Sequence, residues 1–222
     1  GSIAACAKHF VGYGASEGGR DYNTTNIPEN ELRNVHMKPF RKLAEMGVST
    51  FMTSFGDLDG VPATGNRFLL KDVLRDEWNY KGMVVSDWAS VTELCTHGIA
   101  ADDKEATLLA VNAGTNMEMA SEAYVHHLQV LVDEGSVEEE QIDNSVRFIL
   151  ALKYRLGLFD NPYTDSDNFP QVGSDASLLS SKKAAVQSMV LLKNQDQTLP
   201  LELEKLKTIA LIGPLANEPV EQ

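Results

Sequence analysis

The 222-residue sequence contains only two cysteines, Cys6 and Cys95, and they do not form a Cys-x-x-Cys pair. This excludes a disulfide framework and gives no sign of a zinc ribbon. The sequence also lacks a run of about 18 uncharged apolar residues, which a membrane-spanning helix requires. Basic residues are few, with 19 Lys and Arg against 32 Asp and Glu and a formal net charge of −13. Such a chain repels phosphate backbones and anionic lipids, so we expect neither nucleic acid nor a membrane as partner.

Motifs for nucleotides and metal ions are missing or incomplete. Gly12 and Gly14 begin a Gly-x-Gly-x-x-Gly pattern, but Glu17 takes the last glycine position and would place negative charge beside a pyrophosphate. His126 and His127 are neighbours on a predicted helix, so their side chains diverge by about 100° and cannot share an ion. We therefore expect no cofactor and no metal, and a small flavodoxin-like nucleotide binder stays only as a minor alternative.

Apolar runs alternate with helical patterns, which is typical of a parallel sheet with crossover helices. The runs predict strands over residues 3–10, 48–54, 82–87 and 115–119. The apolar spacing predicts helices over residues 31–46, 69–78, 104–114, 124–132 and 136–154. Gly47 and Gly114 are stop signals, and Ser136 with Glu139 offers a capping box for the last helix. Composition agrees with a packed core, since 43% of the residues are hydrophobic.

The sequence changes character after this alternating part. Residues 157–175 are rich in Asp, Asn, Pro and Gly and lack apolar periodicity, which indicates a linker. Beyond them we predict a helix over residues 178–188 and strands over residues 189–194 and 208–214. We interpret the last strand as the first of a second α/β domain.

Polar residues follow the predicted strands at the points where they end. Because the carboxyl ends of parallel strands meet at one rim, we expect these side chains to gather there. They are Lys8 and His9, Thr53 and Ser54, Ser86 and Asp87, and Glu118. A Lys-His pair directly after an apolar strand favours a functional site over an ordinary solvated strand end.

The motifs "KHF", "EGGRDYN", "FMTSFGDLDGVPAT", "LLKDVLRDEWNYKGMVVSDW", "AGTNMEM", "VLLKN" and "IALIGPLA" occur in this order along the chain. In this order they closely resemble glycoside hydrolase family 3, especially its bacterial β-glucosidases. The resemblance implies a (β/α)8 TIM-type barrel, a linker and an α/β sandwich domain, with the active site between the two domains. It implies an α/β fold in which residues 1–158 are the C-terminal half of the barrel, strands five to eight. Residues 159–177 are then the linker, and residues 178–222 begin the sandwich domain.

The resemblance also assigns roles to individual residues. Asp87 in "VVSDW" matches the nucleophile that forms a covalent glycosyl-enzyme. Lys8, His9 and Arg20 match residues that hydrogen-bond sugar hydroxyls, and Trp88 matches an aromatic that offers the sugar ring an apolar surface. Three further residues are expected near the nucleophile: Phe55, where many members have a tyrosine, and Met52 and Met119, which line the pocket.

The implied function is that of a retaining, exo-acting β-glycoside hydrolase of β-glucosidase type, acting on β-linked glucosides or oligosaccharides. The family's acid/base is a glutamate of the second domain, so we expect it outside this chain; Glu17 and Glu118 match no such role. The alternative is a non-catalytic fragment, or one half that needs a complementary chain or an oligomer partner to complete the barrel and has no turnover alone. A parent protein that resembles its bacterial relatives is periplasmic or secreted.

Overall fold

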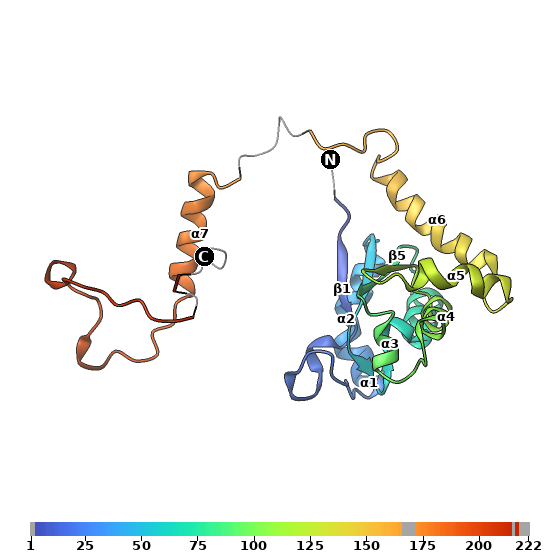
Figure 1. The fold of residues 1–222 in the computed structure, drawn as a ribbon, viewed down its shortest axis with the longest axis horizontal. Helices are drawn as coiled ribbons and strands as arrows, with labels where there is room; N and C mark the ends of the chain where they lie inside the picture. Colours follow the sequence, from blue (N-terminus) through green and yellow to red (C-terminus); the bar gives the residue numbers. More distant parts are fainter. Residues whose placement is uncertain (1–2, 166–171, 215, 218–222) are drawn as a thin grey trace. The chain divides into compact units, whose positions relative to one another are not determined.

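The computed structural model describes residues 3–165, 172–214 and 216–217. The chain divides into two compact units, Gly1–Thr164 and Asp165–Gln222, which we term unit 1 and unit 2 (Figure 1). Residues 166–171 of the predicted linker lie outside the described residues, as do 215 and 218–222 of the predicted second domain. No helix within the described residues is both long and apolar enough to cross a membrane.

Unit 1 is built on a four-stranded parallel sheet in which the strands lie side by side in chain order. The strands are β1 (Cys6–Phe10), β2 (Thr50–Thr53), β5 (Met83–Trp88) and β6 (Met117–Met119). All four predicted strands are therefore confirmed, with β1, β2 and β6 shorter than expected. An antiparallel hairpin of β3 (Asp57–Leu58) and β4 (Val61–Pro62) follows β2. The sequence did not predict this hairpin, because two-residue strands are too short to show a period of two.

Helical segments connect the strands of unit 1. They are η1 (Tyr13–Ala15), η2 (Glu17–Gly19), α1 (Glu29–Glu31), the π-helix η3 (Leu32–His36), α2 (Met37–Glu45), η4 (Ala63–Gly65), the π-helix η5 (Phe68–Glu77), α3 (Glu93–Thr96), α4 (Asp103–Ala113), α5 (Ala123–Asp133) and α6 (Glu139–Arg155). The helical segment predicted over residues 31–46 begins at Glu29 and includes a π-helical turn.

The predicted helix ends are largely confirmed. Gly47 follows α2 with φ 76° and Gly114 follows α4 with φ 111°, a left-handed conformation that glycine adopts without steric cost. The predicted capping box of α6 exists but was placed two residues too early. Glu138 is its N-cap, and the side chain of Gln141 accepts a hydrogen bond from the Glu138 N–H.

The two faces of the sheet pack against different helices. On one face Phe10, Phe51 and Val84 join a buried cluster with the apolar residues of η5. On the other face Met52, Met83 and Val85 are covered by Phe148, Ile149 and Leu152 of α6, the long yellow helix of Figure 1. Side chains alternate along a strand, so Asp87 lies on the same face as Met83 and Val85.

Unit 2 contains helix α7 (Asp175–Ser188) and the short turns η7 (Gln195–Gln197) and η8 (Leu203–Lys205). Helix α7 begins three residues before the predicted start at residue 178, since the Ser174 hydroxyl accepts the Ser177 N–H and caps it. The strands predicted over residues 189–194 and 208–214 are wrong: both segments are described and neither is a strand. A strand is stable only beside another strand, and the described residues of unit 2 offer none.

Candidate active site

Asp87 is a buried carboxylate at the carboxyl end of β5, with only 7% of the residue exposed. Its Oδ1 accepts a hydrogen bond of 2.7 Å from the Trp88 N–H. Its Oδ2 lies 3.3 Å from Nε2 of His9, close enough for an ion pair, but the geometry gives this buried oxygen no hydrogen bond among the described residues. The carboxylate is thus held at one oxygen and faces a titratable ring at the other. Such a group can act as a nucleophile or as a charged partner for a cation.

A closed circuit of hydroxyls fixes the backbone of Asp87. The Asp87 N–H donates to Thr53 Oγ1 at 3.3 Å, and Ser90 Oγ donates to the Asp87 carbonyl at 3.2 Å. Thr64 Oγ1 joins the two hydroxyls at 2.8 Å on each side. Ser90 has one hydrogen and uses it on the carbonyl, so Thr64 must donate to Ser90 and Thr53 to Thr64. Every hydroxyl of the circuit then donates once and accepts once.

His9 and Lys8 lie at the end of β1 and belong to a pocket of about 310 Å³. The His9 ring packs edge-on against Tyr13, with 5.0 Å between the ring centroids. The exposed Lys8 lies with its Nζ 4.0 Å from the sulfur of Met52. The structure therefore brings His9 to Asp87 directly and places Lys8 beside the same strand ends.

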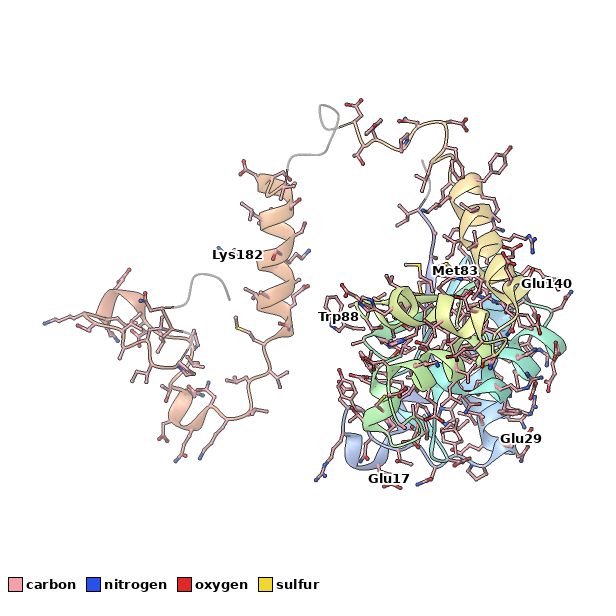
Figure 2. All side chains as sticks on the ribbon, turned by 45° about the vertical axis from the view of Figure 1, so that its right-hand side comes forward. Glu17, Glu29, Met83, Trp88, Glu140 and Lys182 are labelled. Carbon is pink, nitrogen blue, oxygen red and sulfur yellow. The ribbon has the colours of Figure 1, made fainter. Side chains whose placement is uncertain are left out.

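The aromatic residues predicted at the site have different surroundings. Trp88 is 66% exposed, and Figure 2 shows its side chain at the surface of unit 1. Phe55 is half-buried and packs on Tyr22, with ring centroids 4.5 Å apart, and on Tyr13 at 6.2 Å. Phe55 thus has two tyrosines beside it, and Tyr13 donates its hydroxyl hydrogen to Asp21.

The remaining predicted residues are Arg20, Met52 and Met119, and none has a hydrogen bond or ion pair with Asp87 among the described residues. Arg20 is exposed in the loop after β1, and its side chain forms no ion pair with the described residues. Met52 is buried and Met119 partly buried in the apolar cluster beneath α6, on the face that carries Asp87. Their observed role is packing, and they form the apolar floor of this face.

Negative charge accumulates around Asp87. Burial raises the pKa of Glu93, and the neighbouring carboxylates of Asp87 and Asp21 raise it further. The pKa of Tyr13 is raised by burial, then by its hydrogen bond to Asp21 and by the charges of Asp21 and Asp87. Burial and the same carboxylates raise the pKa of Tyr22, with Glu93 contributing as well. The local field therefore stabilises positive charge that develops on a bound molecule.

Sequence reasoning missed several members of this site. Thr64, Ser90 and Glu93 were not candidates, although Thr53 had been singled out at its strand end. No local motif marks Thr64, because its partners lie 11 and 26 residues away along the chain. Glu118, expected to have no catalytic part, accepts hydrogen bonds from Ser121 and from the Tyr124 N–H, which fixes the start of α5.

The fold and site describe a parallel α/β protein with a buried carboxylate at the rim formed by the strand ends. Residues 1–152 match the family description "Glycosyl hydrolase family 3 N terminal domain". The chain belongs to glycoside hydrolase family 3, whose N-terminal domain has a TIM-barrel-type α/β fold.

Curated and solved relatives agree with this family. A periplasmic beta-glucosidase of Salmonella typhimurium is 42% identical, over 97% of this chain and 29% of the relative. A putative beta-xylosidase of Formosa agariphila is 37% identical over similar shares, 97% and 29%. The crystal structure of a beta-glucosidase from Listeria innocua superposes with a TM-score of 0.78 at 40% identity, covering 90% of this chain and 28% of that one. The chain thus spans under a third of the length of these relatives.

Proposed function

We propose that this chain is the nucleophile-bearing part of a retaining, exo-acting β-glycoside hydrolase of β-glucosidase type, with Asp87 as nucleophile. The observation that carries the proposal is the buried Asp87 carboxylate, fixed by the Trp88 N–H and facing His9 at 3.3 Å. In the proposed reaction Asp87 attacks the anomeric carbon while the glycosidic bond breaks and the leaving oxygen takes a proton from an acid. Water then attacks the same carbon, gives a proton to the conjugate base of that acid, and the bond to Asp87 breaks to release its carboxylate.

The surroundings suit this chemistry. Bond breaking passes through an oxocarbenium-like transition state, which carries positive charge. The carboxylates of Asp21 and Asp87 together with Glu93 supply a negative field there. We assign Lys8, His9 and Arg20 to sugar hydroxyls and Trp88 to the sugar ring, with Phe55 packed behind; Met52 and Met119 form the apolar floor.

The domain assignment is part of the same proposal. Strands β1, β2, β5 and β6 follow one another in a parallel sheet, as strands five to eight of a (β/α)8 barrel would. The chain covers 29% of the Salmonella relative, a share compatible with half a barrel and the start of a second domain. That residues 178–222 open an α/β sandwich domain rests on the sequence resemblance.

We propose that the acid/base lies outside these 222 residues. A retaining mechanism needs two carboxyl groups about 5–5.5 Å apart. Among the described residues we choose Glu93 to test this proposal, because its raised pKa is the property expected of a general acid. Glu93→Gln is expected to retain turnover. If it abolishes turnover, and azide restores it as a glycosyl azide, the acid/base lies within the chain.

The substrate class follows from the relatives. Solved structures of the Listeria innocua beta-glucosidase hold glucose and, in a mutant form, laminaribiose. We propose β-linked glucosides as substrates here, and β-xylosides as the competitor, since a beta-xylosidase is also a relative. Comparing kcat/KM for aryl β-glucoside and aryl β-xyloside in the full-length protein tests the preference.

Covalent labelling tests the nucleophile itself. An activated 2-deoxy-2-fluoro-β-glucoside is expected to add one fluoroglucosyl mass to the peptide that contains Asp87. Asp87→Asn should abolish the adduct, and Asp59→Asn, an exposed hairpin carboxylate, should keep it. A folded 222-residue chain that stays unlabelled while the full-length protein is labelled would favour the non-catalytic alternative for the chain alone. Labelling of another residue in the full-length protein would overturn the assignment of Asp87.

A further inference from the structure

A second cavity lies at the opposite end of the sheet from Asp87. It has a volume of about 590 Å³. Its walls come from η5, from the end of α4, from the residues just before β5 and β6, and from α6. Lys81 precedes β5 and Asn116 precedes β6, so the cavity opens at the amino ends of these strands. None of its lining residues belongs to the proposed glycosidase site.

The charge of this cavity is opposite to that of the protein. Lys71, Arg75, Lys81 and Arg147 line it, with Asp76 as the acidic residue among its walls. Arg147 is paired with Asp143 on its own helix at 3.2 Å. The other three cations form no ion pair within the described part of the chain. A chain with net charge −13 therefore concentrates unpaired positive charge in one hollow.

Arg75 is the fixed cation of this group. Its Nη1 donates to the carbonyls of Tyr80 at 2.8 Å and Gly82 at 2.7 Å, and its Nη2 donates to Asn116 Oδ1 at 2.9 Å. The guanidinium lies 4.4 Å from the ring centroid of Phe148. An arginine has five N–H donors, so two of them have no acceptor in the described residues. Burial without a counter-ion lowers the pKa of Arg75 to about 10, and an anion in the cavity would offset that penalty.

Neutral donors complete the lining. Asn116 Oδ1 accepts from both Arg75 and the Val84 N–H, which fixes the orientation of the Asn116 amide. Asn116 Nδ2 then donates to Ser145 Oγ at 3.2 Å. Ser145 accepts this bond, so its own hydroxyl hydrogen is available to a ligand. Val111, Phe148 and Ala151 provide apolar walls beside these donors.

We propose that this cavity is a binding site for a small organic anion, whose carboxylate or phosphate group is held by Arg75, Lys71 and Lys81 and whose apolar part packs on Phe148. An arginine fork matches the paired oxygens of either group. The volume suits a small molecule. This inference does not depend on the glycosidase activity, because it uses other residues.

Calorimetric titration of the 222-residue protein tests the site. The probes are phenyl phosphate, benzoate and inorganic phosphate, each against sodium chloride at equal ionic strength. We expect phenyl phosphate or benzoate to bind more tightly than inorganic phosphate, and the tighter of the two identifies the anionic group. No binding beyond that of chloride would overturn the site, and equal binding of all three probes would overturn the organic ligand.

Variants locate the binding. Lys71 and Lys81 are exposed, so the double variant Lys71→Gln/Lys81→Gln should fold and should weaken binding about five-fold for each lysine. Ser145→Ala should weaken it about three-fold by removing one donor. Lys38→Gln, at an exposed lysine on α2, is the matched control and should change affinity less than two-fold. Equal loss in Lys38→Gln and in the double variant would show non-specific attraction and overturn the proposal.

Discussion

The two ends of the parallel sheet carry opposite charge. At the carboxyl end the charges of Asp21 and Asp87 raise the pKa of Glu93 and of two tyrosines, Tyr13 and Tyr22. At the amino end Lys71, Arg75 and Lys81 line a cavity of about 590 Å³. The carboxyl end suits a transition state with developing positive charge, and the amino end suits an anion. One sheet can present both because strand direction places different loops at its two ends.

The largest effect should come from the carboxylate at the carboxyl end. Asp87→Asn in the full-length protein removes the proposed nucleophile and should lower kcat by about four orders of magnitude. Steady-state kinetics with an aryl β-glucoside measure it, and Asp59→Asn is the matched control. Near-normal turnover by a folded Asp87→Asn variant would show that the acidic rim is not catalytic.

At the amino end the largest effect should be on stability. An added Cβ at Gly82 would lie 2.0 Å from the Tyr80 hydroxyl oxygen and 2.5 Å from the Ser49 carbonyl oxygen. Because a backbone atom cannot yield as a flexible side chain does, Gly82→Ala should cost about 3 kcal/mol or more and lower Tm by about 10 °C. Gly14→Ala, which meets nothing within 4 Å, is the control. Equal Tm values for the two variants would contradict the tight packing at this end.

The hydroxyl circuit links stability to the position of Asp87, the proposed nucleophile. Thr64→Val removes the central hydroxyl, so the hydroxyls of Thr53 and Ser90 each lose one of their two hydrogen bonds in the circuit and keep only the one to the Asp87 backbone, which should cost about 1–3 kcal/mol. Because the circuit holds the backbone of Asp87, kcat should fall while KM changes little. Thr64→Ser keeps the hydroxyl and should restore kcat. If Thr64→Val loses stability but keeps kcat, the circuit does not position Asp87.

The smallest effect should be a change in pH dependence. The pKa of Glu93 is raised above its ordinary value of 4.5 in the folded protein. At pH values between the pKa of the unfolded state and that of the folded state, the folded state therefore binds more protons than the unfolded state. Stability is then lost as pH rises through that window and stays reduced above it. Glu93→Gln should match the wild type at pH 4 and exceed its Tm by about 1–2 °C at pH 7. Glu140→Gln, at an exposed glutamate, is the control and should leave Tm unchanged. A Glu93→Gln variant that is less stable than the wild type at pH 7 would contradict the negative field around Glu93.

Local pattern was enough for the four strands of the parallel sheet in unit 1, but not for the β3–β4 hairpin. Continuous apolar runs predicted β1, β2, β5 and β6, because strands covered on both faces lack polar interruptions. The same reasoning failed for residues 189–194 and 208–214, where apolar runs form no strand. An apolar run such as Val190 to Leu192 favours an extended backbone that could join a sheet. It becomes a strand only when a neighbouring strand is present to accept and donate its backbone hydrogen bonds.

The sequence by itself determined the four strands of the parallel sheet, most helix ends and the candidate Asp87, since each depends on a short stretch of residues. Only the tertiary structure decided that His9 faces Asp87, that Thr53, Thr64 and Ser90 form one circuit, and that η5 and α6 enclose a basic cavity. These features bring together residues that are far apart along the chain. Arg75 and Arg147, for example, are separated by 72 positions in the sequence and line the same cavity. Hydrogen bonds and charges act over a few ångströms in space, so no periodicity or spacing records which distant side chains meet.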